Sequence, residues 1–110
     1  MSKRQARYRI FDHAFELLGN DRETSDRIVA HVVDKLYDQN MILGDTGLFI
    51  NRFVRVRGET VHYIYVICAE DKGQDCVVIL TRKDAKDQNL EVLGQIEKFD
   101  KDHPPLEESA

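Results

Sequence analysis

Apolar residues recur at helical spacing near the N-terminus. Phe11, Phe15 and Leu18 lie at positions i, i+4 and i+7, so one face of a helix would carry all three. Gly19 and the asparagine after it are residues that commonly end a helix. The pattern predicts a first helix over residues 6–18.

A second helix follows, with Thr24 or Ser25 as its N-cap and Asp26 in its first turn, where the helix dipole favours an anion. Asn40 is expected to end it. The apolar stripe of this helix consists of Ile28, Val29, Val32, Val33 and Leu36. Such a stripe predicts a helix packed along one side on the core.

The period changes after Gly47, where apolar residues begin to alternate with polar ones. Three segments, 48–57, 61–68 and 76–82, are dense in β-branched and aromatic residues, which favour strands. Gly58 with Glu59 marks a tight reversal between the first two. The short connections predict an antiparallel meander, and the sheet is expected to have one face covered by the helices.

Residues 89–99 fit a short helix through Val92, Ile96 and Phe99, although they could also begin a fourth strand. The helix is the favoured interpretation. Residues 100–110 are polar and acidic and are expected to form a mobile tail. The prediction is a single α+β domain over residues 1–99, with two N-terminal helices packed on a three- to four-stranded antiparallel meander and a short C-terminal helix.

Composition limits the functions that fit. Hydrophobic residues make up 42% and charged residues 33% of 110 residues, as in a globular domain. Six acidic residues against two lysines give residues 91–110 the whole net charge of −4, which leaves the remainder neutral and argues against strong non-specific binding of nucleic acid. No apolar run is long enough for a bilayer, so a cytoplasmic protein without membrane contact is expected.

Motifs for nucleotide or ordinary zinc chemistry are absent from the sequence, which contains no GxGxxG, GxxxxGK[ST], HExxH or paired CxxC. Cys68 and Cys76 are expected to be reduced thiols, with a disulfide between facing strands as the alternative. The four histidines are scattered along the chain. Neither a cofactor nor a metal ion is expected.

Polar residues on the predicted sheet could carry chemistry. Arg55 and Arg57 lie on one face of their strand, and a neighbouring strand can bring His62 or Thr81 beside them. Together with His13 of the first helix, they could supply the base, cation and acid for phosphodiester cleavage without a metal. The alternative is that these side chains form a solvated sheet face.

A resemblance extends this interpretation. The segments FDHAFELLGNDRETSDRIVAHVV and RFVRVRGETVHYIYVI…VVILT resemble the opening helices and the arginine-bearing hairpin of small toxin ribonucleases of the RelE/ParE and BrnT-like group. The similarity covers residues 8–83. It implies a metal-independent ribonuclease whose catalytic candidates are His13, Arg55, Arg57 and Thr81, and we add His62 as a local candidate.

Small size, an acidic tail and the lack of a specific motif favour a different function, which we prefer. The chain is expected to be a non-enzymatic interaction protein of the immunity, antitoxin or phage-inhibitor type that binds a protein partner. RNA is a second candidate ligand, and a homodimer could form through a sheet edge, at residues 49–57 or 76–82. The candidate binding residues are Arg52, Arg55, Arg57, Tyr63, Tyr65, Arg82 and Lys83.

Overall fold

The structure, a computed structural model, describes residues 6–39, 42–43, 48–71 and 74–104. It has the α+β architecture predicted from the sequence. None of the helices in these ranges is long and apolar enough to cross a membrane. In chain order the elements are β1 (Ala6–Ile10), α1 (Asp12–Leu17), α2 (Arg22–Gln39), β2 (Ile42–Leu43), β3 (Leu48–Arg57), β4 (Thr60–Asp71), β5 (Gln74–Leu80), α3 (Arg82–Asp87) and α4 (Val92–Asp102).

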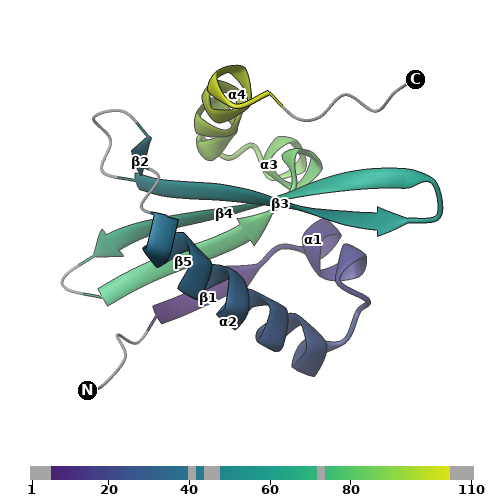
Figure 1. The fold of residues 1–110 in the computed structure, drawn as a ribbon. Coiled ribbons are helices and arrows are strands. Elements are labelled where there is room, and N and C mark those ends of the chain that lie inside the picture. Colours follow the sequence, from purple (N-terminus) through teal and green to yellow (C-terminus); the bar gives the residue numbers. More distant parts are fainter. Residues whose placement is uncertain (1–5, 40–41, 44–47, 72–73, 105–110) are drawn as a thin grey trace.

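The strands form one mixed sheet in the order β1-β5-β4-β3-β2 (Figure 1). The three predicted strands correspond to β3, β4 and β5, which pair antiparallel in sequence order. The purely antiparallel meander is wrong, because β1 pairs with β5 in parallel. This pairing also makes β5 an internal strand, so the predicted open edge at 76–82 is not open.

The start of the predicted first helix is the main error in secondary structure. Residues Ala6–Ile10 are extended and pair in register with Asp75–Ile79, and only Asp12–Leu17 form α1. The parallel ladder supplies hydrogen bonds to the edge of β5, which would otherwise be exposed. This non-local pairing outweighs the helical spacing of Phe11 and Phe15.

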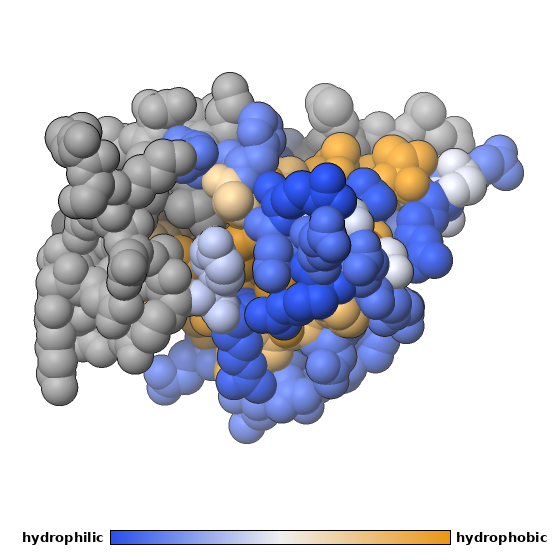
Figure 2. All heavy atoms as spheres, turned by 90° about the horizontal axis from the view of Figure 1, so that it is seen from below, coloured by the Kyte–Doolittle hydropathy of each residue, from blue (hydrophilic) through white to orange (hydrophobic). Residues whose placement is uncertain are grey.

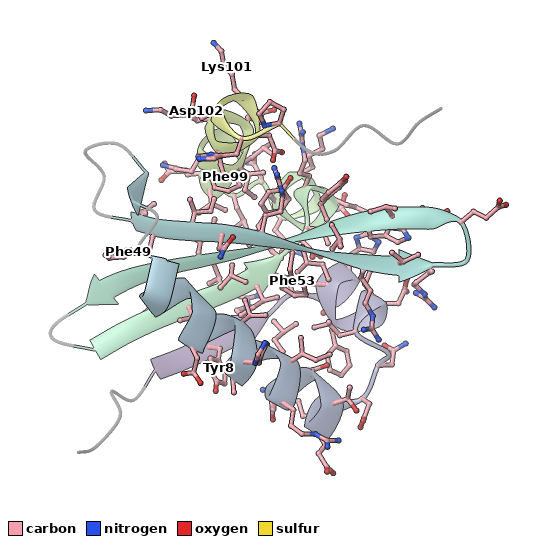
Figure 3. The ribbon with its side chains drawn as sticks, viewed as in Figure 1. Tyr8, Phe49, Phe53, Phe99, Lys101 and Asp102 are labelled. Carbon is pink, nitrogen blue, oxygen red and sulfur yellow. The ribbon has the colours of Figure 1, made fainter. Side chains whose placement is uncertain are left out.

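Helices cover both faces of the sheet, not one as expected (Figure 1). On one side α1 and α2 pack on side chains such as Ile64, Val66 and Phe53. On the other side α4 packs on Ile50 and Tyr65 through Phe99 and its neighbours. Figure 3 shows Phe53 and Phe99 on these opposite sides. The apolar residues on both faces of β4 are therefore explained by burial on both faces.

The helix ends differ from the predictions at two places. The second helix begins at Arg22, so the residue before its start is Asp21. The prediction assigned the N-cap to Thr24 or Ser25 instead. The Asp21 carboxylate accepts hydrogen bonds from the hydroxyl and backbone N–H of Thr24, which lower its pKa. The predicted C-terminal helix is confirmed, but α4 runs to Asp102, so the predicted tail boundary at residue 100 falls inside it.

A buried carboxylate joins the starts of α1 and α3. The Asp84 side chain accepts hydrogen bonds from the backbone N–H groups of His13 at 2.8 Å and Ala14 at 3.0 Å. It also accepts from Thr81 N at 3.0 Å, while Thr81 Oγ1 accepts from Asp84 N, which completes a capping box. One side chain thus caps two helices that are far apart in the sequence.

Replacing Asp84 with alanine is expected to lower the free energy of unfolding by about 2–4 kcal/mol, because buried N–H groups at two helix starts lose their acceptor. Urea denaturation followed by circular dichroism measures this loss. The control is Asp87→Ala, since Asp87 is exposed on the same helix and pairs only with Lys83 among the described residues. Equal stability of the two variants would contradict the role assigned to Asp84.

Candidate functional site

The β3–β4 hairpin extends beyond the rest of the sheet. Strand β5 pairs with β4 only from Tyr65 onward, and β2 pairs with β3 only at Leu48 and Phe49. Residues 53–64 therefore have no third strand beside them in the described part of the chain. We call this segment the arm; it projects past the helices on both sides of the sheet (Figure 1).

One face of the arm is apolar. Val54 and Val56 are 52% and 59% exposed, and both lie on the α4 side of the sheet, where α4 does not reach them. Their cross-strand partners are Tyr63 and Val61, respectively. The arm thus carries contiguous apolar side chains at its solvent-exposed end, in contrast to the mostly hydrophilic outer surface of α1 and the first half of α2 (Figure 2).

The opposite face of the arm is cationic. Arg55 pairs across the hairpin with His62, and Arg57 pairs with Thr60. The Arg55 Nε donates a hydrogen bond of 3.2 Å to the carbonyl of Leu17, the last residue of α1. No carboxylate among the described residues pairs with Arg55 or Arg57.

A pocket of about 240 Å³ lies at the base of the arm, where β5 ends and β4 continues. His13 Nδ1 lies 2.8 Å from Thr81 Oγ1. The ring centroids of His13 and His62 are 6.3 Å apart and the rings meet edge to face. The pocket is lined by these three residues together with Leu17, Val61, Tyr63, Tyr65, Arg82, Lys83 and Asp100.

The cations of the pocket are already neutralised by carboxylates. Arg82 lies 3.5 Å from Glu97 and 3.4 Å from Asp100. Lys83 Nζ lies 2.8 Å from Asp87, and this hydrogen bond raises the pKa of the lysine. The pocket therefore has histidines and a hydroxyl but little net positive charge for an anionic ligand.

A second buried network fixes α4 on the sheet. The Asp100 carboxylate accepts from Arg52 Nη1 at 2.5 Å and from the Tyr65 hydroxyl at 2.6 Å. Burial and the hydrogen bond to Asp100 raise the pKa of the Tyr65 phenol, so it stays a donor. Tyr65 was a candidate binding residue on the sequence, but it is buried in the fold.

The predicted site residues fall into three groups. His13, His62, Thr81, Arg82 and Lys83 do come together around the pocket. Arg55 and Arg57 belong to the arm, as does Tyr63, which like His62 both lies in the arm and lines the pocket. Arg52 and Tyr65 bind Asp100 inside the fold. Arg52 and Arg55 lie on opposite faces of β3, as the alternation of side chains along a strand predicts.

Sequence reasoning missed the residues that matter most for this arrangement. The Thr81-x-x-Asp84 spacing is a capping-box signature and could have revealed the start of α3. Asp100 was assigned to the tail, although it lies one turn beyond Ile96 on the same helix. Val54 and Val56 alternate with polar residues as core residues do. Nothing in the neighbouring sequence shows that β3 extends beyond the helix that covers this face of the sheet.

No protein-family model matches this chain, and no curated protein or solved structure matches it either. The resemblance to RelE/ParE and BrnT-like ribonucleases therefore stays a prediction.

Replacing Asp100 with alanine is expected to lower the free energy of unfolding by about 3 kcal/mol, because the Arg52 side chain, only 15% exposed, would lose its carboxylate partner. The matched control is Asp102→Ala, since Asp102 is exposed at the end of the same helix and points away from the sheet (Figure 3). Thermal and urea unfolding compare the two. A loss of the same size in both variants would refute this role of Asp100.

Proposed function

We propose that this protein is a non-enzymatic interaction protein that binds a protein partner through the arm, residues 53–64. The observation that carries the proposal is the exposure of Val54 and Val56, at 52% and 59%, on a hairpin that extends beyond its helical cover. Large apolar side chains on a projecting ribbon are costly to leave in water, and a partner that buries them gains that free energy.

Charge defines the partner further. The other face of the arm carries Arg55 and Arg57 without carboxylate partners among the described residues, and His62 is the cross-strand partner of Arg55. A complementary surface is apolar where it meets the valines and acidic where it meets the arginines. Such complementarity favours fast and selective association.

The biological class follows from three features that the chain combines: small size, a binding arm and no sequence motif for nucleotide or zinc chemistry. We place it with immunity proteins, antitoxins and phage-type inhibitors, which act by occupying a partner. The proposed compartment is the cytoplasm. The partner in this proposal is an acidic and apolar protein surface.

The double change Val54→Asp and Val56→Asp is expected to abolish partner binding, with affinity reduced by at least about a hundredfold, because two desolvated apolar contacts become buried charges. The tagged wild-type protein is used to capture its partner at stoichiometric yield from the native host. The purified partner is then titrated calorimetrically with the wild type and the variants.

Tyr8→Asp is the matched control, because Tyr8 is also an exposed large hydrophobic residue, at 37%, but lies on β1 at the other edge of the sheet. It should bind like the wild type. Undiminished binding by the double variant, or equal loss in the control, would refute the arm as the binding site. Circular dichroism confirms that each variant is folded.

A second candidate function, metal-independent RNA cleavage, is favoured by one observation: His13, His62 and Thr81 meet at a single pocket. Two imidazoles on one pocket could act as base and acid, with Thr81 holding His13 through its Nδ1. It ranks second because Arg82 and Lys83 pair with carboxylates. Stabilisation of a charged phosphorane would then fall to Arg55, beside His62 on the same face.

This candidate predicts RNA cleavage by the purified protein in EDTA, and single changes His13→Ala or His62→Ala should each slow it by about a hundredfold or more, because each removes a proton-transfer group. His31→Ala is the control, since His31 is exposed on α2, outside the pocket. The absence of cleavage, or cleavage that survives both pocket changes, would eliminate the ribonuclease function.

A further inference from the structure

We infer that the outer edge of β3 binds an extended peptide segment in which acidic and apolar residues alternate, and that this segment adds a strand to the sheet. The inference deepens the proposed function, on which it rests, by naming the chemistry and conformation of what the arm binds. Three features support it: open backbone groups, a two-sided side-chain pattern and a charge pattern that disfavours self-pairing.

The backbone of β3 directs hydrogen-bonding groups away from the sheet at alternate residues. Arg52 N donates to the side chain of Asn51 at 2.7 Å rather than to β4, so the N–H at this position faces the outer edge. Because ladder groups alternate in direction along an antiparallel strand, Val54 and Val56 also direct N–H and C=O outward. Strand β2 pairs with β3 only as far as Phe49, and no other described strand reaches this edge.

An added strand would meet two different surfaces. Its side chains on the α4 side would lie beside Val54 and Val56, and those on the α1 side would lie beside Arg55 and Arg57, because side chains alternate between faces. Alternate apolar and acidic residues therefore match the edge, with the backbone giving affinity and the side chains selectivity. A helix or a compact loop could not satisfy both faces and the outward backbone groups together.

A second copy of β3 fits this edge poorly in the antiparallel registers centred on Val54, Arg55 or Val56. An antiparallel register centred on Arg55 or Val56 sets Arg55 directly opposite an arginine of the other copy, and a register centred on Val54 sets it diagonally from one. Like charges at these positions destabilise strand pairing. The same arginines attract carboxylates, so the edge favours an acidic strand over a homodimer.

The test uses the full-length protein and fluorescein-labelled synthetic peptides, with binding followed by fluorescence anisotropy at low salt. An octapeptide of alternating Glu and Val should bind. Two controls should bind at least about tenfold more weakly: an alternating Lys and Val peptide, and a peptide with the same Glu and Val composition in two blocks, which cannot separate charges from apolar groups by face. N-methylation of alternate peptide bonds should remove binding by blocking the ladder.

The protein variant Arg57→Glu should bind the Glu-Val peptide about tenfold more weakly and the Lys-Val peptide more tightly, because the substitution reverses the charge at an exposed position. Equal binding of the alternating and block peptides, or no binding, would overturn the inference. So would a dimer of the free protein that dissociates on Val54→Asp with Val56→Asp. If a captured protein partner still depends on the two valines, the proposed function stands although the strand-pairing inference fails.

Discussion

The carboxylate of Asp84 is the constraint on which the rest of the arrangement depends. It is 5% exposed and accepts from backbone N–H groups at the starts of both α1 and α3. Because Thr81 is held as the N-cap of α3, the chain leaves the sheet after Leu80. Residues 60–64 of β4 therefore have no β5 residue beside them. The capping box that begins α3 thus also determines where the arm starts and where the pocket lies.

The carboxylates of Asp84 and Asp100 thus stabilise different parts of the fold. Asp84 fixes where β5 stops, and Asp100 fixes α4 over the other face through Arg52 and Tyr65. Helix α4 covers Ile50 and Tyr65 but leaves Val54 and Val56 uncovered on the same face. The apolar end of the arm is a consequence of this placement, which an interacting partner can use.

The sequence predicted those parts of the fold that local patterns determine. Helix α2, the strands β3, β4 and β5 and the C-terminal helix follow from hydrophobic spacing. Strand β1 was not predicted because it forms by parallel pairing with β5, for example Ile10 with Ile79. The alternation of residues within one segment does not reveal a contact between segments so far apart in the sequence. The sequence also identified His13, His62 and Thr81 as candidate site residues. It did not show that Arg82 and Lys83 pair with carboxylates or that Val54 and Val56 are exposed, because these properties depend on contacts between distant segments.

The central claim is that the outer edge of β3 is open along the arm, and amide hydrogen exchange measured residue by residue tests it most directly. The account predicts that the amides of Val54 and Val56 exchange much faster than that of Arg55, whose position faces β4 in the alternating ladder. Protection of Val54 and Val56 equal to that of Arg55 in the free protein would show that the edge is already covered, and would contradict the account.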